Sequence, residues 1–129
     1  MSKLYYSEHI LQVVKTGKYK GYNWLITSCG SHPCCYVEIP QNNKLFEQDF
    51  YEDDVENIDC HGGITFSDHR DFGLGNFYYL GWDYAHFGDY YIRMFGDLIS
   101  ELTPGKKWTI KEIEQEAKNV IKQIIEINK

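Results

Sequence analysis

The clearest hydrophobic pattern lies near the carboxyl end of the chain, after Thr109. Apolar side chains recur there at helical spacing and would share one face of a helix; they are Ile110, Ile113, Ala117, Val120, Ile121, Ile124 and Ile125. Thr109 followed three residues later by Glu112 is a capping-box pattern, which marks the start of a helix. The sequence therefore predicts a C-terminal amphipathic helix that packs on the rest of the protein through this face.

Most of the remaining chain consists of short apolar runs rich in β-branched and aromatic residues, which favour strands. The expected strands are residues 9–15, 22–28, 35–39, 58–66 and 77–84, and the first two form a hairpin across residues 17–21. The segments between them are expected to hold one helical turn at 44–48, a polar connection at 67–76 and a second helix at 89–102, interrupted by Gly96. Together these elements predict one α+β domain over residues 1–129, mainly an antiparallel sheet with the C-terminal helix packed on one face.

Composition adds two expectations to this pattern. Aromatic residues make up 16% of the chain, with 11 Tyr and 3 Trp, so the sheet should have an aromatic-rich core. The formal net charge is −6 and the arginines are only Arg70 and Arg93. Because nucleic-acid backbones are bound by clustered Lys and Arg, this charge argues against direct binding of nucleic acid.

The acidity is concentrated in one segment that contains no basic residue. Its seven carboxylates are Glu47, Asp49, Glu52, Asp53, Asp54, Glu56 and Asp59. Such a run forms a solvated loop, a docking surface for a basic partner, or a mimic of nucleic-acid charge.

The chain shows no sign of export or membrane insertion. No apolar signal region follows Met1, and no window approaches the roughly 18 apolar residues that a membrane span requires. A cytoplasmic protein is therefore expected. In that reducing compartment its cysteines should be thiols rather than disulfides; they are Cys29, Cys34, Cys35 and Cys60.

Two short segments, residues 60–67 and 81–89, combine imidazole and carboxylate side chains with glycines. Zinc sites in proteins use four ligands drawn from imidazole, thiolate and carboxylate groups, and a ligand pair close in sequence lowers the entropic cost of forming the site. Asp83 and His86 form such a pair. The sequence predicts one zinc ion, and its expected ligands are His32, His61, Asp83 and His86.

Alternatives to this ligand set remain open. Asp89 is either another fourth ligand or the acceptor that fixes the tautomer of a ligand histidine. The cysteines could form a rival site, but they lack Cys-x-x-Cys spacing and are expected instead as buried small side chains. A closed four-ligand site would be structural, whereas three ligands and a bound water, with Asp68 or Asp89 as general base, would support hydrolysis.

The motif segments resemble a family of small proteins encoded by bacteriophages and prophages. The similarity spans about residues 22–128 and rests on four segments, which are Gly30–Pro33, Val37–Pro40, Cys60–Phe66 and Gly81–Asp89. The family pattern is a His-Pro loop, His-Gly-Gly-hydrophobic-Thr, Gly-aromatic-Asp-x-Ala-His-x-Gly-Asp and a C-terminal helix. Cys34 and Cys35 depart from it, so the His-Pro match is looser than the later two.

The resemblance implies a phage accessory role more firmly than any reaction. Small acidic phage proteins often inhibit host defence, and they include anti-CRISPR proteins, among them metal-binding ones of the type II class. The resulting expectation is a zinc-binding inhibitor without catalytic residues, acting in the host bacterial cytoplasm. It would bind a Cas effector nuclease through the seven acidic residues and would contact neither nucleic acid nor membrane. The alternative is a metal-dependent hydrolase or binder of a nucleotide or small phosphate ester, with His32, His61 and His86 as ligands.

Overall fold

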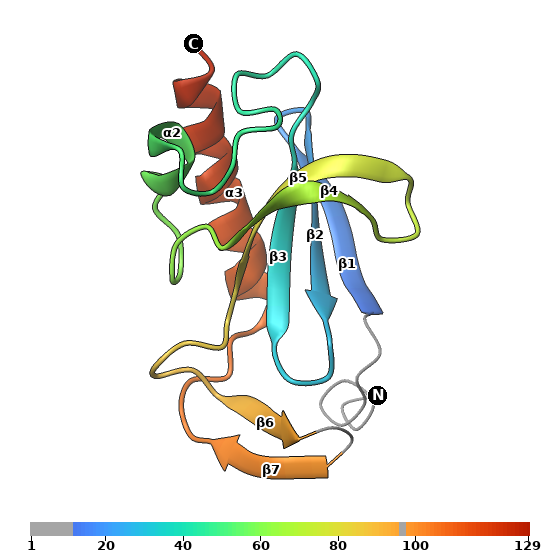
Figure 1. The fold of residues 1–129 in the computed structure, drawn as a ribbon, viewed down its shortest axis with the longest axis vertical. Coiled ribbons are helices and arrows are strands. Elements are labelled where there is room, and N and C mark those ends of the chain that lie inside the picture. The colour runs from blue at the N-terminus through green and yellow to red at the C-terminus, as the bar shows by residue number, and fades with distance from the viewer. Residues whose placement is uncertain (1–11, 96–97) are drawn as a thin grey trace.

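The structure, a computed structural model, describes residues 12–95 and 98–129, and their side chains except within 92–103. Its strands are β1 (Gln12–Tyr19), β2 (Tyr22–Ser28), β3 (Pro33–Glu38), β4 (Phe66–Asp71), β5 (Asn76–Asp83), β6 (Tyr91–Phe95) and β7 (Leu98–Thr103). Its helices are α2 (Asp53–Glu56) and α3 (Ile110–Ile127). Five strands form one antiparallel sheet in the order β1-β2-β3-β5-β4, and β6 pairs with β7 in a separate hairpin (Figure 1).

Helix α3 confirms the strongest expectation from the sequence. The Thr109 hydroxyl accepts a hydrogen bond from the Glu112 main chain at 3.2 Å, and the Glu112 carboxylate accepts one from the Thr109 main chain at 3.0 Å. The apolar face is buried at Ile113, Ala117, Val120, Ile121 and Ile124. It lies against β1, β2 and β3, so the fold is α+β with the helix covering one face of the sheet (Figure 1).

The sheet buries side chains on both of its faces. Because side chains alternate along a strand, Trp24 and Ile26 of β2 face the helix, while Leu25 points to the opposite side. There Leu25 packs with an aromatic cluster that includes Tyr36 and Tyr79, beneath the curled β4–β5 hairpin (Figure 1). The expected aromatic-rich core is confirmed.

The hairpin of β1 and β2 was predicted correctly in kind, but its first strand is displaced. β1 runs to Tyr19, so the turn contains only Lys20 and Gly21, both with positive φ, at 49° and 85°. Two-residue turns of this kind match the twist of the strands they join. The expected strand start at residues 9–11 lies outside the described residues.

The prediction for the middle of the chain placed a strand and a connection at the wrong residues. Residues 58–65 are a loop rather than a strand, because Gly62 and Gly63 adopt φ values of 72° and 80° that a strand does not allow. The segment assigned to a connection, 67–76, instead holds most of β4, which pairs with β5. The helical turn expected at 44–48 is a series of turns, and the short helix α2 follows it.

The expected second helix at 89–102 was also wrong, because β6 and β7 occupy this range. The run Tyr90-Tyr91-Ile92 is aromatic and β-branched, and such residues favour a strand over a helix. Gly96, which was expected to interrupt that helix, lies outside the described residues.

Two further observations concern the membrane and the thiols. In the part of the chain that the structure describes, no helix has the length and apolar character needed to cross a bilayer. All four cysteines are free thiols, and Cys35 is buried in the core.

Candidate functional site

A tight turn at residues 83–89 follows β5 and forms the centre of the candidate site. Its own carboxylates close it: Asp83 accepts a hydrogen bond from the Ala85 main chain at 3.1 Å, and Asp89 accepts one from the His86 main chain at 2.9 Å. The Asp89 main chain donates back to the His86 carbonyl at 2.9 Å. Gly88, with φ at 93°, allows the chain to reverse here. We refer to this segment as the 83–89 turn.

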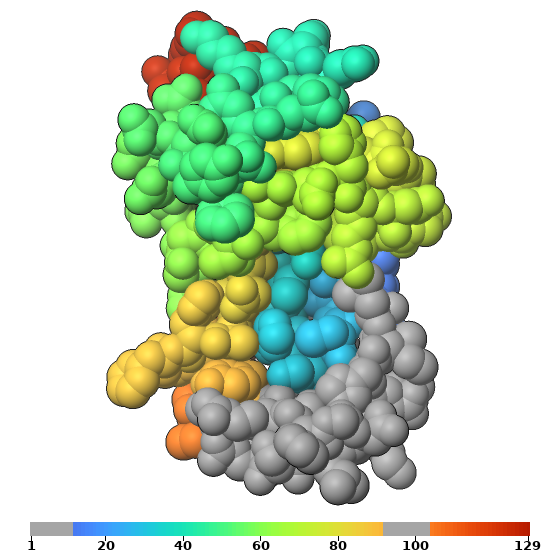
Figure 2. Space-filling view, viewed as in Figure 1, coloured from blue at the N-terminus to red at the C-terminus, as the bar shows by residue number. Residues whose placement is uncertain are grey.

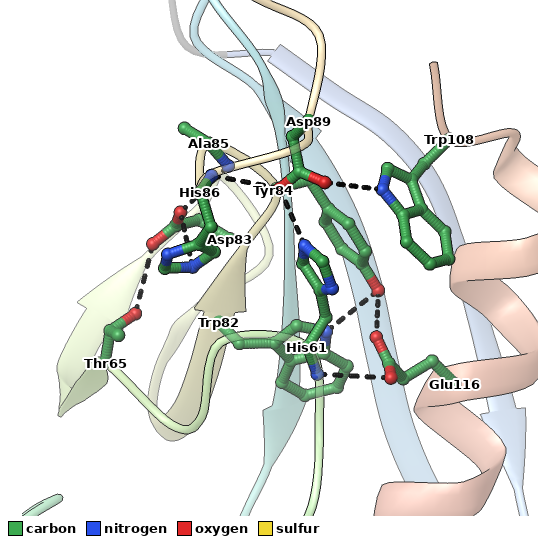
Figure 3. Close-up of polar contacts among 10 residues, drawn as sticks. All are labelled: His61, Thr65, Trp82, Asp83, Tyr84, Ala85, His86, Asp89, Trp108 and Glu116. Atoms are coloured by element: carbon green, nitrogen blue, oxygen red, sulfur yellow. Dashed lines mark hydrogen bonds and ion pairs between the residues drawn. The ribbon is translucent and has the colours of Figure 1, made fainter. Parts of the chain in front are cut away.

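Asp89 joins this turn to two other parts of the chain. Its side chain is only 2% exposed and also accepts hydrogen bonds from His61 Nε2 at 2.6 Å and Trp108 Nε1 at 2.8 Å (Figure 3). Burial alone would raise the pKa of Asp89, but the hydrogen bonds from His86, His61 and Trp108 outweigh it, and the pKa lies below its ordinary value. Asp89 is therefore a buried carboxylate held ionised by three donors.

His61 is enclosed by aromatic rings. Its imidazole stacks on Tyr84, with centroids 5.0 Å apart and planes 7° apart, and packs against Trp108 at 4.9 Å. Because Nε2 donates to a carboxylate, the ring carries a proton on that nitrogen. The His61 main chain also donates to Glu116 of α3 at 3.2 Å, so the 60–65 loop is tied to the helix (Figure 3).

The Glu116 carboxylate also accepts a hydrogen bond from the Tyr84 hydroxyl. That hydroxyl in turn accepts a hydrogen bond from Trp82 Nε1 at 3.0 Å (Figure 3). Burial and the bond to Glu116 raise the pKa of Tyr84, so the phenol keeps its proton and acts as the donor. A continuous chain of hydrogen bonds therefore links Trp82, Tyr84 and Glu116 of the helix.

His86 lies on the other side of the turn, beside Asp83. Its Nε2 is 3.2 Å from Asp83 Oδ1, yet this nitrogen is buried and has no hydrogen-bond partner among the residues described. The Thr65 hydroxyl donates to the other oxygen of Asp83 at 3.2 Å. A Cβ on Gly62 would come within 2.1 Å of His86 Nε2, so the glycine makes room for the imidazole.

His32 is placed at the edge of this cluster. With Asp83 and Thr65 it lines a hollow of about 270 Å³ in front of Trp82. Burial lowers the pKa of His32, and the nearby carboxylates of Asp83 and Asp89 oppose this only in part. The imidazole is therefore neutral at physiological pH.

The structure gathers the predicted ligands in one region but does not orient them around a point. No three His, Cys, Asp or Glu side chains within residues 12–95 and 98–129 are arranged to hold a metal ion. The Nε2 of His61 is already bonded to Asp89, which agrees with the acceptor role considered for Asp89 rather than the ligand role. Zinc stays a prediction with His32, His61, Asp83 and His86 as its expected ligands, because the bond from His61 Nε2 to Asp89 leaves the Nδ1 of that ring for an ion.

Cys34, Cys60 and Asp89 do not suit a catalytic role. Burial raises the pKa of both Cys34 and Cys60 to about 12, so neither is a thiolate at neutral pH. Asp89 is buried and already accepts three hydrogen bonds, which leaves it poorly placed as the general base of a hydrolase. The arrangement fits a structural network that fixes the shape of the 83–89 turn.

The acidic segment forms a second candidate site. All seven of its carboxylate residues are exposed, while Leu45, Val55 and Ile58 are buried and anchor the segment to the core. Between the carboxylates, Phe50 and Tyr51 are 47% and 64% exposed and pack edge to face with each other. We call residues 47–59 the acidic surface.

Sequence reasoning missed several residues of both sites. Trp108 and Glu116 complete the network around His61, and Phe50 and Tyr51 lie within the acidic surface. The sequence carried a weak signal for Glu116, since it is a charged residue beside the apolar face of the helix, next to Ala117. Trp108 gave no signal, because its partner lies 19 residues away.

Comparisons with protein-family models, with curated proteins and with solved structures found no match for this chain.

Proposed function

We propose that this protein acts by binding another protein through the acidic surface. The main observation behind this proposal is that seven exposed carboxylates and two exposed aromatic rings share one segment, which buried residues anchor to the core. Protein interfaces combine aromatic anchors with a polar rim, and charge on the rim selects the partner. The partner therefore presents a basic surface with an apolar patch.

The charges of this surface are available to a partner. Among the described residues, Glu47 is the only one of the seven with a basic group in ion-pair range, which is His69 at 2.8 Å. Complementary charge of this kind speeds encounter and makes association sensitive to salt.

Nucleic-acid-binding proteins present extended basic surfaces, so they are the partner class that this charge suits best. The resemblance to phage and prophage proteins supports a narrower proposal, in which the protein inhibits a host defence system, with a Cas effector nuclease as the first partner to test. Occupying the basic nucleic-acid site of such a nuclease would block it without any catalytic step.

The test uses a purified type II Cas effector nuclease loaded with guide RNA. We expect the protein to bind it and to reduce cleavage of target DNA, and the variant D53K/D54K/E56K to bind at least about tenfold more weakly at low salt. Single substitutions D54K and E126K change the net charge equally, and only D54K should weaken binding. Equal binding by the triple variant and the native protein would remove the acidic surface from the proposal.

One structural zinc ion remains part of the proposal. Its support is the buried Nε2 of His86, which has no hydrogen-bond partner among the described residues and has Asp83 3.2 Å away. Elemental analysis of the purified protein and of H86A tests it. Equimolar zinc that is lost in H86A would support the ion, and protein purified without chelators that contains no zinc would exclude it.

A further inference from the structure

Phe87 is held entirely in solvent at the tip of the 83–89 turn. The backbone on both sides of it is fixed: His86 and Asp89 exchange hydrogen bonds, and the Gly88 carbonyl accepts from the Lys106 main chain at 2.8 Å. The buried side chain of Asp89 secures the same turn to His61 and Trp108. The aromatic ring is therefore displayed on a rigid support.

Such exposure is costly for a phenylalanine. Burying this side chain is favourable, and a flexible tip could bury part of the ring by folding back onto the surface. The hydrogen bonds of the 83–89 turn hold the backbone at Phe87 in place. An aromatic anchor whose backbone is already ordered loses less conformational entropy on association than one on a flexible loop.

We propose that Phe87 inserts into an apolar pocket of the same protein partner that the acidic surface contacts, and that the network around Asp89 serves to present it. This inference rests on the proposed function. It gives the His-Gly-Gly and Asp-x-x-His segments a role in recognition, since they build the support of the anchor.

Both features lie along one side of the molecule. Figure 2 shows the gold segment that contains the 83–89 turn projecting from the same margin as the green residues of the acidic surface. A partner that lies along this side meets both. The loop that contains His61 follows the acidic surface in sequence and is tied to the 83–89 turn through Asp89.

The charge around Phe87 differs from that of the acidic surface. The nearby Lys106 is paired with Glu112 at 2.7 Å, and the Lys107 ammonium lies over the ring of Tyr90 at 4.5 Å. The pocket that receives Phe87 should therefore have a neutral or acidic rim, whereas the surface facing residues 47–59 should be basic. The two contacts are expected to respond differently to salt.

The experiment measures binding kinetics on the immobilised, guide-loaded type II Cas effector nuclease at two salt concentrations. F87A should raise the dissociation rate tenfold to a hundredfold at both, with the association rate nearly unchanged, and F87L should recover part of the loss. L74A removes another exposed apolar side chain, from the β4–β5 connection, and should have no effect. The thermal midpoint of F87A should equal that of the native protein, because Phe87 has no buried contacts to lose.

The outcomes separate this inference from the proposed function. If the native protein does not bind the nuclease, both fall together. If it binds but F87A dissociates at the native rate, or no faster than L74A, only the role of Phe87 falls. Sedimentation that reveals a native dimer dissociated by F87A would assign the anchor to a second copy of this chain. Phe87-dependent binding to anionic phospholipid vesicles would assign it to a membrane, and either result overturns the inference.

Discussion

Two of the carboxylate–imidazole pairs among the described residues have similar N–O distances but different roles. Asp89 and His61 are 2.6 Å apart with side chains 2% and 22% exposed, whereas Glu47 and His69 are 2.8 Å apart with side chains 62% and 40% exposed. Removing one partner of a buried pair leaves an uncompensated polar group, but water replaces a partner lost at the surface. Burial and the number of donors, rather than the distance, decide how much each pair matters.

This difference separates the two candidate sites. In the 83–89 turn the Asp89 carboxylate is buried and already accepts three hydrogen bonds that stabilise the turn. The same turn exposes the apolar ring of Phe87. In the acidic surface most carboxylates face water and are available to a basic partner. One region thus supplies a rigid shape and the other supplies charge, which are the two ingredients of a selective interface.

The largest effect is expected from Asp89. D89A leaves the donors of His61, Trp108 and the His86 main chain without their acceptor, so the free energy of unfolding should fall by about 3 to 5 kcal/mol. D89N keeps an acceptor oxygen and should cost less. Urea unfolding followed by tryptophan fluorescence measures both. A loss below about 1 kcal/mol in D89A would mean that the network is as dispensable as a surface pair.

Gly62 and Gly63 offer a matched comparison within the same loop. Both have positive φ, so alanine should cost about 1 to 2 kcal/mol at either position. Only at Gly62 would the new Cβ meet the His86 imidazole, while at Gly63 nothing lies within 4 Å. G62A should therefore be the more destabilising variant by about 1 kcal/mol or more. Equal unfolding free energies for the two variants would contradict the position of His86.

Acid should remove the contribution that ionised Asp89 makes to the free energy of unfolding. Its pKa in the folded protein lies below the ordinary value of 3.8, so its charge stabilises the fold fully above about pH 3.8. As the pH falls through the lower folded-state pKa, Asp89 takes up a proton and this contribution is lost. The difference in unfolding free energy between native protein and D89N should shrink as the pH falls below about 3.8. A difference that grows in acid would reverse the sign of the shift.

The sequence predicted the parts of this structure that depend on local pattern. The capping box at Thr109 and the periodicity after it specify α3 almost alone, and the turn at Lys20-Gly21 closes a hairpin between adjacent strands. The helix expected at 89–102 was wrong, because the aromatic and β-branched run Tyr90-Tyr91-Ile92 favours the strand that forms there. Strand β4 was missed because it is a polar edge strand, with four of its six residues exposed.

For the candidate site, the sequence indicated which residues come together but not how they are paired. His61, Asp83, His86 and Asp89 do form one cluster. Their orientation depends on Trp108 and Glu116, which approach only once α3 packs on the sheet. A pattern of potential ligands is the same whether a metal ion or a hydrogen-bond network joins them, so the sequence could not distinguish the two.

The smallest effect is expected from the exposed pair. A double-mutant cycle with E47Q and H69A should give a coupling energy below about 1 kcal/mol, and added salt should reduce it further. The same cycle with D89N and H61A should give a larger value that salt hardly changes, because the pair is shielded from counterions. If the surface pair instead couples strongly, the acidic surface is held rigid by it, and association with a basic partner would then have to break or rebuild that contact.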